Sequence, residues 1–110
     1  MNSIKVEKCY NSRGGEVKGS EWSFEMEYDL KKVLRLVFER EIEENKNYDI
    51  DYVEYYNDYN NVSCNNVDDI VDDIVKCYNK CKEYMEEVGC WWLSEDGFCR
   101  IYKDGVLVEG

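Results

Sequence analysis

The chain of 110 residues contains no histidine, proline, alanine, threonine or glutamine. Histidine is the commonest general base in catalysis and the commonest imidazole ligand of metal ions. Its absence excludes Ser-His-Asp and Cys-His catalysis and every zinc site that needs a histidine. Because no enzyme motif stands out either, we expect a protein that is not an enzyme and needs no cofactor.

Long apolar segments are also missing. No apolar run approaches the length of about 18 residues that a membrane-spanning helix needs. Residues 1–10 alternate polar and apolar side chains and lack the apolar core of a signal peptide. We therefore expect a cytoplasmic protein without a membrane partner, located in the host cytoplasm if it is viral. Hydrophobic residues make up 44% of the chain, which argues against disorder.

The lack of glutamine, with abundant glutamate, lysine, valine and tyrosine, is typical of heat-loving archaea and their viruses, which avoid thermolabile amides. Ten asparagines argue against strong avoidance of amides. An AT-rich genome would produce much of the same bias, so a thermophilic or viral origin and a purely genomic cause both stay open.

Cysteine is unusually frequent for a cytosolic chain, at six residues: Cys9, Cys64, Cys77, Cys81, Cys90 and Cys99. No two follow the C-x-x-C spacing, which disfavours thioredoxin-like and zinc-ribbon sites. Cys77 and Cys81 lie four residues apart, on one face of a predicted helix. Buried thiols behave as small hydrophobic groups. We expect core thiols first, one or two disulfides second and a metal site last, with Cys77 and Cys81 buried and free of metal.

Hydrophobic periodicity divides the chain into strands and helices. Alternation predicts strands at 4–10 and 21–28, with Lys8 on the same side as Ile4 and Val6. Asp29 is the predicted N-cap of a helix with an apolar stripe that only Glu41 interrupts. Alternation at 48–57 predicts a third strand, with Tyr48, Ile50 and Tyr52 facing one way and Asp49 and Asp51 the other.

A second apolar stripe predicts a long helix from about residue 65 to 88, which Gly89 ends in a left-handed conformation. Residues 90–109 are expected to form three short strands. Asp104-Gly105 predicts a two-residue hairpin turn that places Tyr102 opposite Leu107. Residues 1–110 therefore form one α+β domain in the order ββαβαβββ, a mostly antiparallel sheet with two helices packed on one face.

Negative charge is concentrated in one part of the chain. The net charge is −11, and residues 39–73 carry −10 of it, with 12 acidic and 2 basic side chains. Five tyrosines lie in the same segment, between residues 48 and 59. The simplest interpretation is a solvated acidic face that aids solubility, although about 2–8 net charges are enough for that purpose in a small domain.

The functional alternative is that spaced carboxylates imitate the phosphates of nucleic acid, which lie ~7 Å apart along a strand and dominate non-specific binding. Carboxylates four residues apart on a helix, or two apart on a strand, have similar spacings of about 6–7 Å. Such a surface would repel nucleic acid itself, so we expect no direct binding to DNA or RNA. Tyrosine adds rigid contact area of the kind enriched in protein interfaces.

A divalent metal is the other possible ligand of clustered carboxylates, at Asp68, Asp69, Asp72 and Asp73 or at Asp49, Asp51 and Glu54. The second group lacks the glycine and the distal glutamate of an EF-hand loop. Acidic residues near the start of a helix are also favoured simply by the helix dipole. We therefore expect no metal site.

The sheet strands at the C-terminal end carry many aromatic residues. We expect that the four aromatic residues Trp91, Trp92, Phe98 and Tyr102, together with Leu107, cannot all be buried in so small a sheet. An exposed apolar patch above a few hundred square ångströms is rare on a free monomer. These four residues are therefore the predicted interface of a homodimer, and a small structural or assembly subunit of viral origin is the rival function. An enzyme that uses cysteine, aspartate and tyrosine is the least favoured alternative.

Three features together carry a resemblance: the acidic segment 39–73, the tyrosine cluster 48–59 and the sequence Cys90-Trp91-Trp92. In size and composition the chain resembles small acidic orphan proteins of archaeal viruses and phages. Some of these inhibit host defence nucleases and include anti-CRISPR proteins and DNA mimics. The resemblance implies an inhibitor but assigns no family-specific residue.

Our leading hypothesis is an acidic protein that docks its carboxylates on the basic groove of a nucleic-acid-handling host protein. The predicted partner-binding residues are Glu39, Glu43, Glu44, Asp49, Asp51, Tyr52, Glu54, Tyr55, Asp58, Asp68, Asp69, Asp72 and Asp73.

Overall fold

The structure, a computed structural model, describes residues 1–85 and 89–108. Within these residues the order of elements is ββαααβββ. The elements are β1 (Asn2–Ser12), β2 (Gly15–Met26), α1 (Leu30–Lys46), α2 (Tyr52–Asn60), α3 (Val67–Met85), β3 (Cys90–Trp92), β4 (Gly97–Lys103) and β5 (Val106–Leu107). The predicted α+β class is confirmed, but a third helix stands where we predicted a strand.

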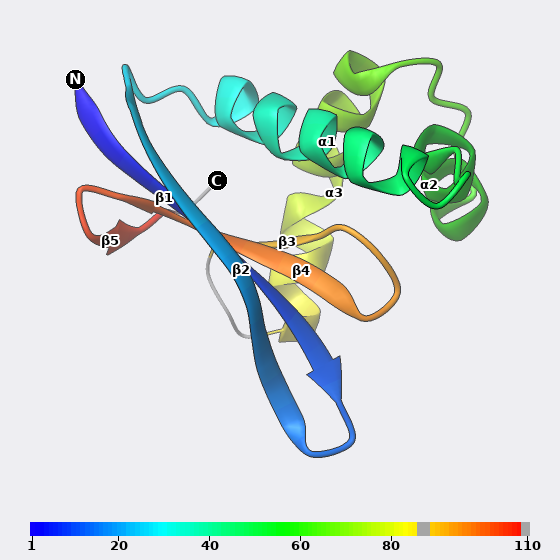
Figure 1. The fold of residues 1–110 in the computed structure, drawn as a ribbon, viewed down its shortest axis with the longest axis horizontal. Coiled ribbons are helices and arrows are strands. Elements are labelled where there is room, and N and C mark those ends of the chain that lie inside the picture. The colour runs from blue at the N-terminus through cyan, green and yellow to red at the C-terminus, as the bar shows by residue number, and fades with distance from the viewer. Residues whose placement is uncertain (86–88, 109–110) are drawn as a thin grey trace.

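The five strands form one antiparallel sheet in the order β2-β1-β4-β3. The short strand β5 also pairs with β4, at residues 102–103, after the stretch of β4 that pairs with β3. Figure 1 shows the long β1–β2 hairpin projecting beyond the helices, which gather at the other side of the molecule. Alternate residues of the strands are buried against the helices, among them Ile4 and Val6 of β1 and Ile101 of β4. The helices therefore cover one face of the sheet and enclose the main core.

Helix α1 begins where the sequence predicts. The carboxylate of Asp29 accepts a hydrogen bond from the backbone N–H of Lys32 at 3.1 Å, so Asp29 is the N-cap. The apolar stripe of α1 is buried through Val33, Leu34, Val37 and Phe38. These side chains pack against β1 and the other two helices. Burial of this stripe fixes the orientation of α1 over the sheet.

The prediction of a strand at 48–57 is wrong, because α2 occupies most of this segment. The carboxylate of Asp51 caps α2 by accepting a hydrogen bond from the N–H of Glu54, and Asn61 ends it in a left-handed conformation. Tyr52 and Tyr56, one helical turn apart, are both buried against Phe38. Helical spacing of these two rings outweighs the short polar–apolar alternation that suggested a strand.

The hairpin at the C-terminal end has the predicted turn and register. Asp104 and Gly105 both have positive φ, 50° and 83°, as a two-residue turn of this kind requires. Tyr102 lies opposite Leu107 in the β4–β5 pair. At the start of this region Gly89 has φ of 69°, left-handed as predicted. The predicted helical residues 86–88 lie outside the described residues.

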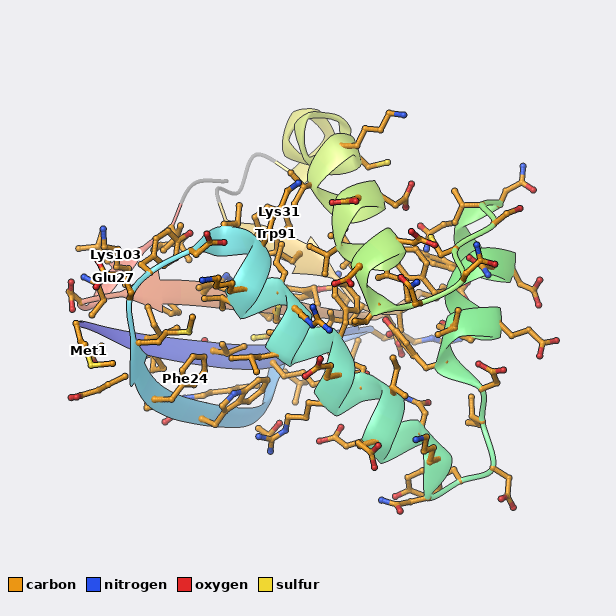
Figure 2. The ribbon with its side chains drawn as sticks, turned by 90° about the horizontal axis from the view of Figure 1, so that it is seen from above. Met1, Phe24, Glu27, Lys31, Trp91 and Lys103 are labelled. Carbon is orange, nitrogen blue, oxygen red and sulfur yellow. The ribbon has the colours of Figure 1, made fainter. Side chains whose placement is uncertain are left out.

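The aromatic residues of β3 and β4 are divided between buried and half-buried positions. Trp91 and Phe98 are each only 1% exposed, whereas Trp92 and Tyr102 are half-buried. Figure 2 shows Trp91 in the space between the sheet and the helices. Phe98 lies on the opposite face, where it packs against Trp92 with ring centroids 5.2 Å apart. The two faces of the sheet share the aromatic residues, and only two of the four are fully buried. The expectation that they could not all be buried in this sheet is therefore confirmed, and dimerisation itself stays a prediction.

The five cysteines whose side chains the structure describes are free thiols. Cys9, Cys90 and Cys99 are buried, which confirms core thiols at these positions and excludes disulfides among the five. We expected Cys77 to be buried, but its side chain is half-buried. Its sulfur lies 4.0 Å from the carboxylate of Asp73, one turn earlier on α3, and not in the apolar core. The side chain of Cys81 lies outside those that the structure describes.

Candidate interaction surface

The chain neutralises half of its own acidic segment. Six of the twelve carboxylates in residues 39–73 form ion pairs with lysine or arginine side chains of the same chain. They are Glu39 with Arg35, Glu41 and Glu44 with Lys8, Glu44 also with Arg40, Glu43 with Lys46, Asp68 with Arg35, and Asp72 with Lys31. Most of the partners are on α1, which carries its basic residues among the acids.

Two of these ion pairs join α1 to α3. Arg35 lies 3.0 Å from both Glu39 on its own helix and Asp68 on α3, and Lys31 lies 3.1 Å from Asp72. Figure 2 shows Lys31 on the side of α1 that faces α3. Exposed pairs of this kind contribute only about 0–1 kcal/mol each to stability. They do make the electrostatic potential around α1 and α3 less negative, however. Glu39, Asp68 and Asp72 are therefore less suited to bind a basic partner than unpaired carboxylates are.

Three further carboxylates are occupied by local hydrogen bonds. Asp51 caps α2, and Asp69 accepts from the backbone N–H of Asn65 at 2.9 Å, at the start of α3. Asp73 accepts from the hydroxyl group of the buried Tyr56 at 2.7 Å. These acids help to hold α2 and α3 in place. Asp51 is exposed, as we expected, but it caps a helix instead of standing on a strand.

The remaining three carboxylates are all close to α2. Asp49, Glu54 and Asp58 are exposed, and none of their carboxylates forms an ion pair or hydrogen bond with the part of the chain that the structure describes. Glu54 and Asp58 lie one turn apart on the solvent side of α2, where Cβ atoms are about 5–6 Å apart. Asp49 lies in the turn before α2. Uncompensated charge of the segment is thus concentrated at residues 49–58.

Exposed apolar side chains surround these three acids. Tyr48 is 77% exposed and Ile50 is 45% exposed. On α2, the ring of Tyr59, 44% exposed, stacks on Tyr55 with a centroid separation of 6.2 Å. Large aromatic residues are enriched in protein interfaces. We call this set, six exposed residues and the half-buried Tyr55, the α2 surface: Tyr48, Asp49, Ile50, Glu54, Tyr55, Asp58 and Tyr59. Tyr52, which we predicted as a binding residue, is buried and does not belong to it.

Backbone hydrogen bonds fix the conformation of the turn between α1 and α2. The N–H groups of Asp49 and Ile50 donate to the carbonyl groups of Lys46 and Asn45 at 3.1 and 3.0 Å. This is the pattern of a helix end that needs a left-handed residue, usually glycine. Asp49 takes that position with φ of 56°. The turn therefore presents a carboxylate where glycine would be the less strained choice.

A cleft lies beside the α2 surface, between the C-terminal end of α1, this turn and the loop after β3. Its volume is about 420 Å³. Four tyrosines and three charged residues make up most of its lining: Tyr10, Tyr48, Tyr52, Tyr55, Lys8, Glu41 and Glu44. The hydroxyl of Tyr55 accepts from the N–H of Glu95, and that of Tyr52 donates to the carbonyl of Leu93. These hydrogen bonds fix α2 to the loop that closes the cleft.

A buried ion pair forms the floor of the cleft. Lys8 bonds to Glu41, which is 6% exposed, and also lies 3.6 Å from Glu44. Burial alone lowers the pKa of Lys8, but the hydrogen bond and the charge of Glu41 outweigh it and hold that pKa above its ordinary value of 10.5. The pair was not among our predicted site residues. The sequence did contain an indication of this pair. A lysine on an inward strand position and a glutamate in an apolar helical stripe each need a partner of opposite charge when they are buried.

Comparison of the chain with protein-family models, with curated proteins and with solved structures found no match. Among the described residues, no three cysteine, aspartate or glutamate side chains come together in a way that could hold a metal ion. In the same residues, no helix has the length and apolar character needed to cross a membrane. The case for a function therefore depends on the α2 surface and the cleft.

Stability should fall steeply at alkaline pH. Burial raises the pKa of the phenols of Tyr52 and Tyr56 and of the thiol of Cys99 above their ordinary values of 10.0 and 9.0. The unfolded chain then releases these protons first, so their contribution is complete below about pH 9 and is lost as pH rises further. We expect the free energy of unfolding to decrease by about 1.4 kcal/mol per pH unit for each such group that ionises only on unfolding.

Urea denaturation between pH 7 and pH 11 measures this dependence. Tyr56→Phe removes one of the titrating groups. The free energy of unfolding should then decrease less steeply with pH, by the slope that corresponds to one proton. A free energy of unfolding that stays constant from pH 8 to pH 11 would contradict the assignment of these groups to the core.

Proposed function

We propose that this protein is a non-enzymatic inhibitor that docks its α2 surface on the basic groove of a nucleic-acid-handling protein. One observation carries the proposal. Within the part of the chain that the structure describes, the carboxylates of the acidic segment that form no ion pair, helix cap or hydrogen bond are those of Asp49, Glu54 and Asp58, and they lie among exposed aromatic and aliphatic side chains.

The physical basis is electrostatic. With a net charge of −11, the protein is attracted to a basic surface over long distances, which raises the association rate. Carboxylates one helical turn apart, such as Glu54 and Asp58, approach the ~7 Å spacing of neighbouring phosphates. Tyr48, Ile50 and Tyr59 supply the apolar contact area that charge alone lacks. Nucleic acid itself is a poor partner because both surfaces are negative.

A host defence nuclease is the target class that fits the resemblance of the sequence to small acidic viral inhibitors. Such an enzyme presents a groove lined with lysine and arginine where its nucleic acid lies. An acidic protein that fills the groove excludes the nucleic acid without any chemistry of its own. Inhibition by occupancy needs neither a metal nor a cofactor.

Reversing two charges of the α2 surface should abolish partner binding. The variant Glu54→Lys/Asp58→Lys places two positive charges against the basic groove, and we expect affinity to fall about 100-fold, or roughly 3 kcal/mol. Both side chains are exposed and form no ion pair with the described residues, so the fold should be retained. Proteins retained from an extract by immobilised wild type are compared with those retained by the variant.

The matched control is Glu25→Lys/Glu27→Lys. These two acids are also exposed and lack ion pairs within the described residues. Figure 2 shows Glu27 at the opposite end of the molecule from α2. Both variants change the net charge from −11 to −7. If the control loses the partner as completely as the α2 variant, the overall charge and not the α2 surface is responsible, and the proposal is wrong.

A further inference from the structure

The cleft and the α2 surface form one continuous area. Tyr48, Ile50 and Tyr55 line the cleft and also belong to the α2 surface. Any partner that covers the α2 surface therefore lies across the mouth of the cleft. A volume of about 420 Å³ is enough to admit a long side chain from that partner.

Glu44 is a carboxylate of the cleft lining that has spare capacity for a hydrogen bond. Glu41 and the ammonium of Lys8 satisfy each other in the floor. Glu44 stands nearer the mouth with 45% of its side chain exposed, 3.3 Å from Arg40 and 3.6 Å from Lys8. Strong charge-assisted hydrogen bonds are about 2.7–2.9 Å long, so both contacts of Glu44 are loose. Its oxygens remain able to accept from a further donor.

The aromatic lining favours a flat cation. Tyr48 is largely exposed at the mouth, and Tyr10 is 38% exposed nearby. An arginine side chain can stack its planar guanidinium on such a ring while donating in its plane to a carboxylate, which a lysine ammonium cannot do. The chain already contains this combination, because Arg40 lies 4.2 Å over the ring of Trp22 while it contacts Glu44.

We infer that the cleft receives an arginine side chain of the partner, with its guanidinium against Tyr48 and bound to Glu44. This inference rests on the proposed function, since the basic groove supplies the arginine. An anion is disfavoured because Glu41 and Glu44 face the cleft and Lys8 is already engaged. Within the complex, this arginine sets the register in which Glu54 and Asp58 meet the neighbouring basic residues.

The test is an NMR titration of the isolated protein with a capped Gly-Arg-Gly peptide. We expect saturable shifts at cleft residues such as Tyr48 and Ser94, with half-saturation at about 1–10 mM, as befits a single side chain. The same peptide with citrulline, which has the same shape without the charge, should cause no such shifts. Equal shifts with citrulline, or no saturable shifts with arginine, would overturn the inference.

Two variants place the binding in the cleft. Tyr48→Ala removes an exposed ring and should reduce the affinity for the arginine peptide at least fivefold without loss of thermal stability. Val106→Ala removes an exposed apolar side chain that belongs neither to the cleft lining nor to the α2 surface, and it should leave the affinity unchanged. If both variants bind as wild type does, the site is wrong.

The outcomes separate the inference from the proposed function. If the arginine peptide fails to bind but Glu54→Lys/Asp58→Lys still loses the partner, the cleft inference fails and the proposed function stands. If the peptide binds in the cleft but the α2 reversal keeps the partner, the proposed function fails and the arginine site stands.

Discussion

Replacing Lys8 with methionine should lower the free energy of unfolding by about 3 kcal/mol, because the carboxylate of Glu41 then remains buried without its partner. Glu41 is 6% exposed, and only 11% of the Lys8 side chain is exposed. Arg40, which precedes Glu41 in the chain, is engaged with Glu44. Urea denaturation at pH 7, followed by tryptophan fluorescence, measures the loss.

The double variant Lys8→Met/Glu41→Met is the control that identifies the cause. Replacing both members of a buried ion pair with apolar groups of similar volume is often neutral. We therefore expect the double variant to regain most of the stability that Lys8→Met loses. A single variant that loses less than about 1 kcal/mol, or a double variant no more stable than the single one, would show that the pair is not enclosed as described.

Phe38→Ala should cost about 3–5 kcal/mol, the usual range for deletion of a buried aromatic ring. Phe38 is fully buried, and its ring packs against Tyr52 and Tyr56 with centroid separations of 6.2 and 5.9 Å. These contacts attach α2 to α1. Amide hydrogen exchange should therefore accelerate more in α2 than in the sheet, and partner binding should weaken because the α2 surface loses its fixed position.

Leu36→Ala is the matched control for this prediction. Leu36 lies on the same helix but is 42% exposed, so its truncation should cost less than about 1 kcal/mol. The same denaturation and exchange measurements apply to both variants. If Phe38→Ala leaves the exchange of α2 unchanged while the sheet is destabilised, α2 is held by other contacts.

Local patterns predicted the elements whose apolar side chains keep one period throughout. The first two strands alternate polar and apolar side chains, and α1 has an apolar stripe at helical spacing after Asp29. The residue types of Asp104-Gly105 predict the two-residue turn between β4 and β5. The strand predicted at 48–57 was wrong because the first residues of this segment belong to the turn that ends α1. Their alternation is not continued by α2, where Tyr52 and Tyr56 follow helical spacing. A short segment that spans two conformations shows no single period.

The acidic segment was visible in the sequence, but its division into paired and unpaired acids was not. Pairing of Asp68 and Asp72 depends on Arg35 and Lys31, which only the packing of α1 against α3 brings near. The cleft likewise combines β1, α1, the turn before α2 and the loop after β3. Contacts between segments this distant leave no local periodicity, so the sequence predicted the charge of the surface but not its location on α2.

The most direct test of the central claim is a competition between this protein and nucleic acid for the captured partner. The partner is first bound to a fluorescently labelled nucleic acid, and the anisotropy of the label is followed as this protein is added. Wild type and Glu25→Lys/Glu27→Lys should release the nucleic acid at similar concentrations. The variant Glu54→Lys/Asp58→Lys should need about 100-fold more, and raising the salt concentration should weaken displacement by the wild type. If the label stays bound at saturating wild type, or if the α2 variant displaces it equally well, the α2 surface does not occupy the nucleic-acid groove.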